Sequence, residues 1–295
     1  MCIAIWSLEH PEYALILSSN RDEYLDRQTQ NAHFHSFTID SSDGGGSVLS
    51  GLDKRAGGTW LGINRAGRVA LLTNITEDAT NFGTSRGSLV SSFLLSDASL
   101  PLEQEARRLA APDTKFSGFN LMLFAPLMKS DGSLSYESLL VTNHGAGGVL
   151  ASRPLCEDER RCGGVSNGVD GAGGSDWPKV KRATQDFDAV LQSLSPDHTE
   201  AELVNQLMDI LSWTSQEPIT ERVHFRKTVH VLPLAVRPSG SAQPGTYATR
   251  LSTVVLVSRN REVHFYERDV WELAEGKAIM ASPSSTRVFR FKLDI

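Results

Sequence analysis

Segments with strong strand-forming character in this sequence come in pairs that short turns connect. In one pair, the apolar arms Thr59–Ile63 and Arg68–Asn74 flank the turn sequence NRAG. The other two pairs are residues 2–8 with 13–18 and residues 247–258 with 262–267. Strands joined by such short turns pair antiparallel, because parallel neighbours need a long crossover connection. The chain is therefore expected to build antiparallel sheets and not a doubly wound parallel sheet.

Helical patterns also occur in pairs, and strand segments separate the pairs. Residues 85–96 and 102–110 form the first pair. In the second pair, Asp176 precedes a proline as the expected helix cap, and another helix covers residues 199–213. The remaining strand segments are residues 119–124, 138–141 and 162–166. This order predicts an α+β protein with stacked, mainly antiparallel sheets and helices on their outer faces.

The length of the chain, 295 residues, allows one large domain or two smaller ones. Residues 36–47 are rich in Ser, Asp and Gly and are expected to form a surface loop. The Pro- and Gly-rich stretch 233–245 is interpreted as an internal loop and not as a domain linker, because too little chain follows it for a second core. A single domain over residues 1–295 is therefore predicted.

The charge balance disfavours a nucleic-acid-binding function. The formal net charge is −6, with 40% hydrophobic and 22% charged residues, as is ordinary for a globular protein. No domain-scale excess of Lys and Arg is available to replace the counterions of phosphates. The basic cluster of Lys179, Lys181 and Arg182 is interpreted as a solvated helix face.

Targeting signals and membrane spans are not expected in this sequence. No segment approaches the ~20 consecutive apolar residues that a membrane-spanning helix needs. The amino terminus lacks a basic region, and the first thirty residues are too acidic for a mitochondrial presequence. A cytoplasmic protein that is not secreted is predicted.

The cysteines point to neither a disulfide framework nor a zinc site. The sequence contains three cysteines, Cys2, Cys156 and Cys162. Because their number is odd and small, they fit a protein from a reducing compartment. His33 and His35 share one face of an extended segment and have the chemistry to hold a metal. A strand edge or a polar loop is the favoured interpretation, and no metal is predicted.

Cys2 permits two interpretations. It stands at the start of an apolar run, MCIAIW, where a buried thiol in a strand is common. Methionine, however, is usually removed when the next side chain is small. Removal would leave Cys2 with a free α-amino group beside its thiol, which is a nucleophile with its own base.

Five further polar residues follow or interrupt apolar strands. Arg21 and Asp22 follow the strand that pairs with the Cys2 strand. They are either a surface charge cluster or groups beside Cys2, where an arginine favours a thiolate and an aspartate holds an ammonium group. Asn74 and Asn167 each follow a strand, where an amide serves either as an oxyanion donor or as a turn residue. Arg250 precedes a strongly β-forming run and needs a buried partner or an outward-facing position.

Together these stretches resemble the NRDE family, also called the transport and Golgi organisation protein 2 family. The matching motifs are MCI, NRDE, GGTWLGINRAGRVALLTN, SRGSLV, VSNGVD, WPKV and YATRLSTV. They occur in the family's order and cover nearly the whole chain. The resemblance implies links to Golgi organisation, secretion, mitochondrial metabolism and haem or lipid handling.

A more distant resemblance, in GINRAGRVALLTN, is to choloylglycine and penicillin V hydrolases. These are N-terminal nucleophile hydrolases, and the resemblance implies a four-layer αββα sandwich with an exposed N-terminal cysteine as nucleophile. By motif, Cys2 corresponds to that nucleophile, Asn74 and Asn167 to oxyanion-hole residues, and Arg250 to a late arginine. Arg21 and Asp22 correspond imperfectly to the early Arg/Asp pair, because two residues separate the pair in those hydrolases.

Two functions follow as expectations. The first is a cysteine amidohydrolase or acyl-transfer enzyme that acts on a linear amide or a thioester and requires no cofactor. The second is a non-catalytic protein that keeps the fold and binds a small acyl, lipid or haem-like ligand. Haem binding is implied by the family resemblance alone, since the sequence contains neither Cys-Pro nor C-x-x-C-H. Association with the Golgi or mitochondria has the same basis.

Overall fold

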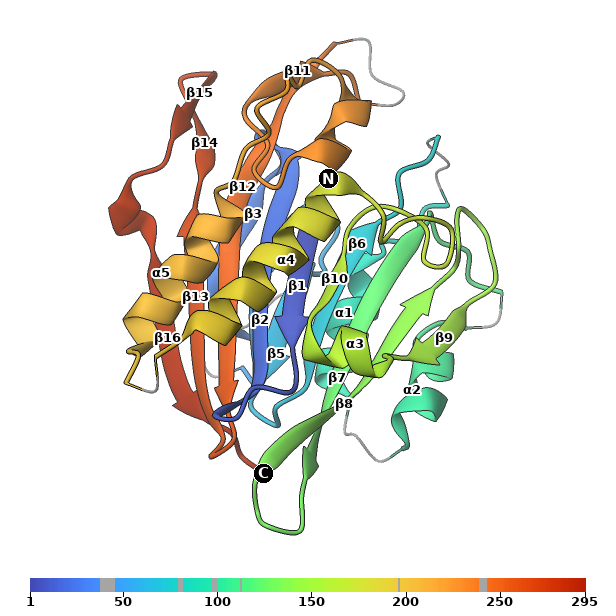
Figure 1. The fold of residues 1–295 in the computed structure, drawn as a ribbon. Coiled ribbons are helices and arrows are strands. Elements are labelled where there is room, and N and C mark those ends of the chain that lie inside the picture. Colours follow the sequence, from blue (N-terminus) through green and yellow to red (C-terminus); the bar gives the residue numbers. More distant parts are fainter. Residues whose placement is uncertain (38–45, 79–81, 97–99, 112, 196, 239–242) are drawn as a thin grey trace. The chain divides into compact units, whose positions relative to one another are not determined.

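The computed structural model divides the chain into two units (Figure 1). Unit 1 comprises Met1–Arg27, Glu157–Ser258 and Val263–Arg290, and unit 2 comprises Gln28–Cys156, Arg259–Glu262 and Phe291–Ile295. The structure describes all residues except 38–45, 79–81, 97–99, 112, 196 and 239–242.

The sheet of unit 1 is antiparallel wherever its register is defined. Its strand order is β10-β1-β2-β12-β13-β16, with β11 paired to β12. The bounds are β1 Ile3–Ser7, β2 Tyr13–Tyr24, β10 Gly163–Val165, β11 Leu234–Val236, β12 Gly245–Ser258, β13 Glu262–Asp269 and β16 Arg287–Lys292. A separate hairpin is formed by β14 Trp271–Ala274 and β15 Lys277–Met280.

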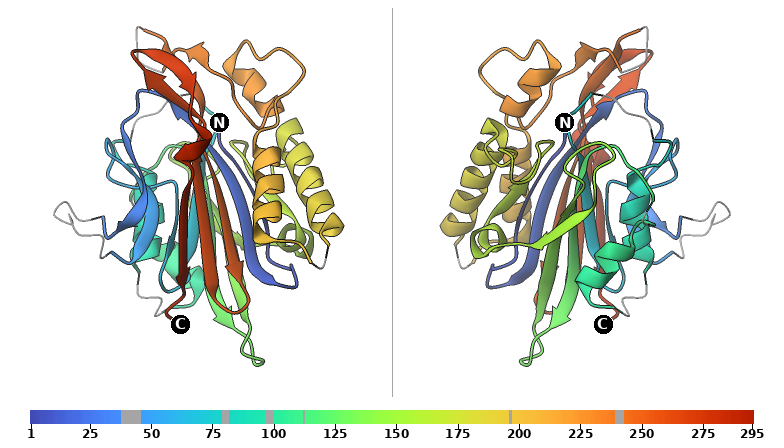
Figure 2. Two further views of the ribbon diagram at one scale, coloured as in Figure 1. Left: turned by 90° about the vertical axis from the view of Figure 1, so that its left-hand side faces the viewer. Right: turned by 90° about the vertical axis from the view of Figure 1, so that its right-hand side faces the viewer.

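Two long helices pack against this sheet. They are α4 (Pro178–Ser193) and α5 (Glu200–Leu211), and they run side by side along it (Figures 1 and 2). Their apolar stripes meet β1, β2 and β12 in one core cluster, which includes Phe187, Leu207 and Ile5. The burial of such stripes is the main favourable term in holding helix to sheet. The shorter helices of unit 1 are α3 Glu157–Arg161, η1 Arg222–Lys227 and η2 Pro283–Ser285.

Unit 2 is a meander in which each strand pairs antiparallel with the next along the chain. The bounds are β3 Thr29–His35, β4 Val48–Asp53, β5 Leu61–Asn64, β6 Val69–Asn74, β7 Phe119–Met128, β8 Leu134–Thr142 and β9 Ala151–Pro154. The helices α1 (Gly87–Leu95) and α2 (Leu102–Arg108) cover it, and Phe93 and Leu102 belong to its core. The hairpin β5–β6 confirms the prediction from NRAG.

A buried ion pair ties this hairpin to the helices. Arg68 contacts Glu105 at 2.5 Å and donates from Nε to the Phe93 carbonyl at 3.0 Å. Its guanidinium also lies 3.9 Å from the centre of the Phe93 ring. Because an arginine so deeply buried needs paired charge and hydrogen bonds, Arg68 has a structural role in unit 2.

The predicted α+β class, with two mainly antiparallel sheets and a helix pair on each, is confirmed. The final hairpin is also confirmed, as β12 and β13. Thr199 caps α5 and forms a capping box with Glu202. Residues His33 and His35 lie on the edge strand β3, in agreement with the strand-edge interpretation.

Several sequence expectations were wrong. Lys179 is fully buried, and only Lys181 and Arg182 belong to a solvated helix face. The reason is helical geometry, since residue 179 shares the inward stripe of Ala183 and Phe187. Trp177, and not Asp176, occupies the N-cap position of α4.

Strand content was underestimated. The second strand was expected to end at residue 18 but continues to Tyr24, so that NRDE lies within β2. The expected loop 233–245 contains strand β11 (Leu234–Val236) and the first residue of β12, and its residues 239–242 lie outside the described part. Most of the expected loop 36–47 also lies outside it. Strands β14, β15 and β16 were not anticipated, because their exposed, mixed sequences carry little periodic signal.

Candidate functional site at the amino terminus

The register of β1 and β2 brings NRDE to the start of the chain. Ile3 faces Asn20 in this antiparallel pair. Continuing the register places Arg21 opposite Cys2 and Asp22 opposite Met1. Asn20 itself is structural, because its amide donates to the carbonyls of Leu211 and Val229.

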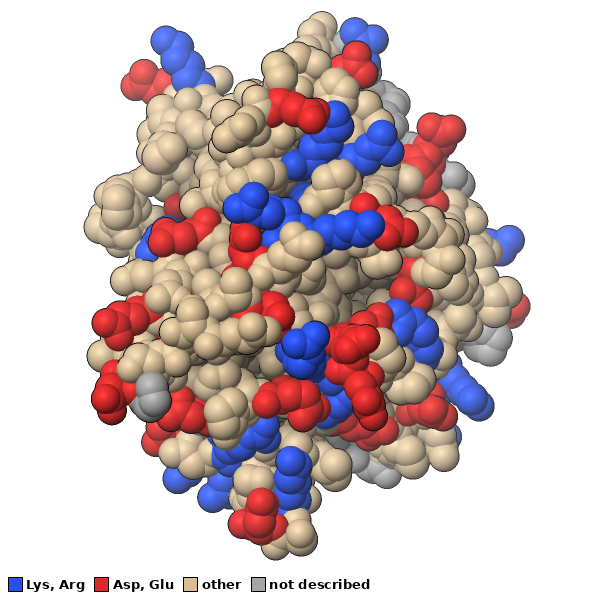
Figure 3. All heavy atoms as spheres, in the orientation of Figure 1, with Lys and Arg blue, Asp and Glu red and all other residues tan. Residues whose placement is uncertain are grey.

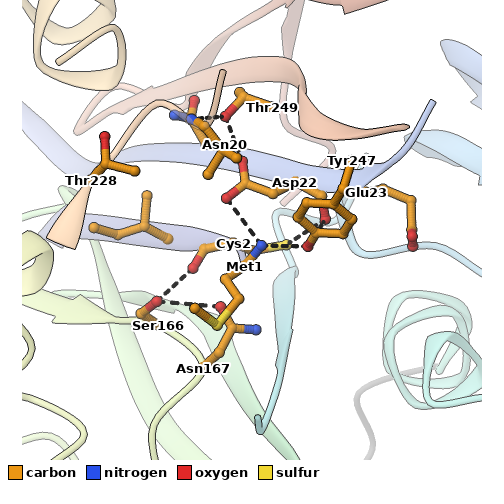
Figure 4. Close-up of polar contacts among 12 residues, drawn as sticks. Met1, Cys2, Asn20, Asp22, Glu23, Ser166, Asn167, Thr228, Tyr247 and Thr249 are labelled. Atoms are coloured by element: carbon orange, nitrogen blue, oxygen red, sulfur yellow. Dashed lines mark hydrogen bonds and ion pairs between the residues drawn. The ribbon is translucent and has the colours of Figure 1, made fainter. Parts of the chain in front are cut away.

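Asp22 holds the terminal amine. Its Oδ2 lies 3.2 Å from the Met1 nitrogen, which also donates to the Tyr247 hydroxyl (Figure 4). Tyr247 in turn donates to the backbone oxygen of Asp22 at 2.8 Å, and Thr249 donates to Asp22 Oδ1 at 2.6 Å. Burial lowers the pKa of the Met1 amine, although the Asp22 charge opposes that shift. Two hydroxyl-bearing residues of β12 thus hold Asp22, Tyr247 through its backbone oxygen and Thr249 through its carboxylate.

The Cys2 sulfur also lies beside Asp22, 3.8 Å from its backbone oxygen. Burial raises the pKa of the Cys2 thiol, while the terminal ammonium and Arg21 act in the opposite direction. The Cys2 carbonyl accepts a hydrogen bond from Ser166 Oγ at 2.7 Å. With Met1 in place, the thiol is therefore favoured over the thiolate, which is the nucleophilic form.

Lys179 extends to this site from the first turn of α4. Its Nζ donates to the Met1 carbonyl oxygen at 2.5 Å, and its side chain is fully buried. Burial lowers the pKa of Lys179, and the nearby Asp22 and Cys2 oppose that shift. A buried ammonium, a carboxylate and a thiol thus meet at the end of the chain, which is the kind of charge arrangement found at functional sites.

Apolar groups surround the Met1 side chain, which is 4% exposed. It belongs to a cluster with Phe225, Val231 and Val236. Tyr247 packs against this cluster and stacks on Phe225 with the ring centres 5.4 Å apart. The first residue of the chain is thus enclosed by an apolar wall on its side chain and by polar groups on its backbone.

Unit 1 brings together four of the six predicted site residues. Cys2 and Asp22 are neighbours, and Arg21 is close enough to act on the Cys2 thiol. Asn167 follows Ser166, whose hydroxyl bridges the Cys2 carbonyl and Asn167 Oδ1 (Figure 4). Arg21 and Asn167 are both buried, 5% and 4% exposed.

Of the other two predicted residues, Arg250 lies in unit 1 near Arg21, close enough for the two charges to interact, and Asn74 belongs to unit 2. Arg250 donates to the carbonyls of Arg27 and, at 3.5 Å, Tyr24, so that it contacts the chain just beyond β2. It sits at an irregularity in the pairing of β12 with β2, where the register shifts between Thr249 and Leu251. Asn74 is the exposed last residue of β6 in unit 2, where it pairs with Phe119. The oxyanion role of Asn74 stays a prediction.

Sequence reasoning missed Lys179, Tyr247, Thr249 and Ser166. For Lys179 a signal existed, since a lysine in line with the apolar stripe of a helix needs a buried partner. Tyr247 and Thr249 lie in the motif YATRLSTV and alternate with Ala248, so they share one face of β12. Ser166 directly precedes Asn167 and carries no distinguishing pattern.

Charges on the surface of the helix pair are mixed. Lys181 pairs with Asp176 and Arg182 with Asp186. Figure 3 shows Lys and Arg interspersed with Asp and Glu on this face. Such a surface lacks the concentrated positive field that steers nucleic acids.

Two further searches covered the described residues alone. Within them, no cluster of three or more His, Cys, Asp or Glu side chains is arranged to hold a metal ion. No helix in the described ranges has the length and apolar character to cross a membrane.

Comparison with known proteins gives consistent relatives. The sequence profile of the family "Transport and Golgi organisation 2" matches residues 1–272. A Transport and Golgi organization 2 homolog from Mus musculus is 30% identical over 264 residues, which covers 88% of this chain and 87% of the relative. Transport and Golgi organization protein 2 from Drosophila melanogaster is 27% identical and covers 90% and 91%.

Among solved structures, an N-acylethanolamine-hydrolyzing acid amidase ortholog from Caenorhabditis elegans aligns with a TM-score of 0.49 at 12% identity, over 86% of this chain and 92% of that one. A mutant conjugated bile acid hydrolase from Clostridium perfringens aligns with a TM-score of 0.47 at 10% identity, over 99% and 97%. The family match covers every strand of the two seven-stranded sheets except β16, together with the lysine of α4, and the chain belongs to the Transport and Golgi organisation 2 family.

Proposed function

We propose that this protein is an N-terminal cysteine enzyme that cleaves a linear amide or a thioester once Met1 has been removed. The observation that carries the proposal is the contact of the buried Asp22 carboxylate with the terminal amine, 3.2 Å away, beside the Cys2 sulfur. Hydrolysis of the Met1–Cys2 peptide bond would release methionine and free the α-amine of Cys2 itself. The nucleophile and its base would then belong to one residue.

The chemistry requires no cofactor. The Cys2 amine takes the thiol proton, and the sulfur forms a bond to the substrate carbonyl carbon. The protonated amine then gives its proton to the leaving amine or thiol as the C–N or C–S bond breaks. Water hydrolyses the resulting thioester, releasing a carboxylic acid and regenerating the thiol.

Charge stabilisation would come from several of the residues named above. The Lys179 ammonium supports a thiolate and a developing oxyanion, because a fixed cation in a water-poor site acts strongly. Asn167 is proposed as an amide donor to that oxyanion. Arg21 opposes the rise that burial causes in the pKa of the Cys2 thiol, and Asp22 keeps a carboxylate-bearing residue beside the Cys2 sulfur.

The cellular setting is proposed from the relatives, which carry the names Transport and Golgi organization 2 and Transport and Golgi organization protein 2. We place the protein in the cytoplasm, in association with the Golgi and with a role in Golgi organisation and secretion. A mitochondrial association is proposed from the family resemblance.

The proposal is tested by the mass and the thiol reactivity of the purified protein. Intact-mass analysis should show loss of Met1. A limiting electrophilic thiol probe should then label Cys2 faster than the exposed Cys156 and faster than Cys162, whose pKa burial raises to about 11. A chain engineered to keep residue 1 is the control and should label slowly at Cys2. Retained Met1, or a Cys2 no more reactive than Cys156, would count against an enzyme.

A ligand-binding function without catalysis is the second candidate. The observation that favours it is the raised pKa of the Cys2 thiol while Met1 is present, caused by burial. A protonated thiol is also a poor haem ligand, since the thiolate binds iron. The residues of the site therefore do not fit a haem bound through Cys2. The bound ligand of this second candidate is proposed to be an acyl or lipid group.

A further inference from the structure

We infer that the space occupied by Met1 is the acyl subsite, and that it binds an acyl group derived from an α-amino acid with an unbranched apolar side chain. This inference rests on the proposed function, because Met1 must leave before a substrate can take its place. Met1 is itself an aminoacyl group attached to Cys2. Its contacts therefore show how the folded chain binds such a group.

The α-ammonium is recognised by charge. The Met1 nitrogen contacts Asp22 Oδ2 at 3.2 Å and the Tyr247 hydroxyl. The β1–β2 register places Asp22 opposite residue 1 and not opposite Cys2. The carboxylate is thus positioned for a group in the place of Met1, and Thr249 holds it there from its other oxygen.

The carbonyl is recognised by Lys179, whose Nζ lies 2.5 Å from the Met1 oxygen. In Met1–Cys2 this carbonyl is bonded to the Cys2 nitrogen, whereas in an acyl-enzyme it would be bonded to the Cys2 sulfur. These two atoms belong to the same residue, so an acyl group on either one lies within the same surroundings. Lys179 is the donor in place for the acyl oxygen.

The side chain of the acyl group is recognised by shape and apolarity. The Met1 side chain is 4% exposed among Phe225, Val231 and Val236, with Tyr247 beside them. A polar side chain there would lose its hydration without gaining partners. Unbranched apolar side chains of about the size of methionine are therefore expected to be preferred.

Selectivity for a free α-amine follows from burial. Asp22 is 4% exposed, so a ligand without an ammonium would leave Asp22 Oδ2 without the ionic contact that the Met1 amine makes with it at 3.2 Å. Sites that recognise a polar substrate group in this way reject analogues lacking it strongly. An N-acylated amino acid, or a simple fatty acyl group, is expected to bind poorly.

The test uses the full chain beginning at Cys2, obtained by cutting a fusion protein directly before that residue, with Cys2→Ser to prevent turnover. Binding of L-methionine amide is measured by calorimetry, with N-acetyl-L-methionine amide as the matched probe. We expect saturable binding of the amide and affinity at least about tenfold weaker for the acetylated probe, as loss of a charged hydrogen bond implies. The same chain with Met1 retained should not bind the amide, because Met1 occupies the subsite.

Two variants locate the binding. Asp22→Asn should weaken L-methionine amide by about tenfold or more, and Tyr247→Phe should weaken it less. Tyr247→Phe keeps the ring that packs on Phe225. If Asp22→Asn does not fold, Tyr247→Phe therefore still tests whether this site binds the ammonium group. Equal affinity for the two probes, or full affinity of the Met1-bearing chain, overturns the inference.

The outcomes separate the inference from the proposed function. Binding of L-methionine amide by the Cys2→Ser chain, without hydrolysis of any amide or thioester by the unsubstituted chain, supports the subsite and contradicts the enzyme. Hydrolysis of a fatty acyl amide without binding of L-methionine amide supports the enzyme and contradicts the subsite.

Discussion

Lys179 Nζ donates a hydrogen bond to the carbonyl oxygen of Met1, 178 residues earlier in the chain, at a distance of 2.5 Å. This bond fastens the first turn of α4 to the first residue of the chain, two positions before β1. The ammonium lies within the influence of both Asp22 and Cys2. This relationship links the stability of unit 1 to the chemistry of its amino terminus.

Lys179→Met should lower the free energy of unfolding by about 1–3 kcal/mol, because it removes a buried hydrogen bond and the cation that balances Asp22. Methionine nearly matches the length of the lysine stem, so packing changes little. Urea unfolding followed by circular dichroism measures the effect. The control is Lys181→Met on the exposed side of α4, expected within about 0.5 kcal/mol of the parent. Equal effects of the two substitutions would show that Lys179 is energetically unimportant.

Asp22→Asn should lower the free energy of unfolding by about 3–5 kcal/mol, since it leaves the buried ammonium groups without their counter-charge. Combining Asp22→Asn with Lys179→Met should be less damaging than the two effects added, by about 0.5–3 kcal/mol. The double-mutant cycle by urea unfolding checks this. Strict additivity would mean that Asp22 and Lys179 do not interact.

Arg250→Met separates a structural role from a catalytic one. The guanidinium donates to the carbonyls of Arg27 and Tyr24, and a charged hydrogen bond of this kind contributes about 1.5–3 kcal/mol. The substitution should therefore reduce stability while leaving the rate of Cys2 labelling unchanged. The exposed Arg226→Met is the matched control for loss of charge in unit 1. Unchanged stability together with slow Cys2 labelling would instead support the catalytic role predicted from the family pattern.

Acid should destabilise unit 2 through His35. Burial, and secondarily the nearby His33, lowers the pKa of His35 from 6.5 to about 4. As pH falls from 6.5 to about 4, the unfolded chain takes up a proton at this residue and the folded chain does not, so stability decreases. At about 1.4 kcal/mol per pKa unit, the loss approaches about 3 kcal/mol.

His35→Gln should flatten this part of the stability profile, because glutamine does not titrate and its amide has the means to replace the 2.9 Å contact of the imidazole with Ser50 Oγ. His224→Gln is the control and should keep the acid slope. Thermal unfolding measured between pH 4 and pH 7 distinguishes the variants. A slope unchanged by His35→Gln would assign the effect to other groups.

Much of the secondary structure was predictable because its signals are local. The NRAG turn, the capping Thr199 and the apolar stripes of α4 and α5 act over a few residues, and the structure contains each of them. The clustering of Cys2, Arg21 and Asp22 followed from the first hairpin alone, since short turns determine register. The motifs also sufficed to name the family.

The sequence by itself therefore determined the antiparallel sheets, the helix pairs and the position of Cys2 at the start of β1. Only the tertiary structure decided that Lys179 points inward to Met1, that Tyr247 and Thr249 hold Asp22, and that Arg250 contacts the end of β2. The physical reason is the distance along the chain over which each interaction acts. Hydrophobic periodicity and turn chemistry are properties of neighbouring residues, whereas these contacts join residues more than 170 positions apart and exist only once α4 and β12 have packed around the amino terminus.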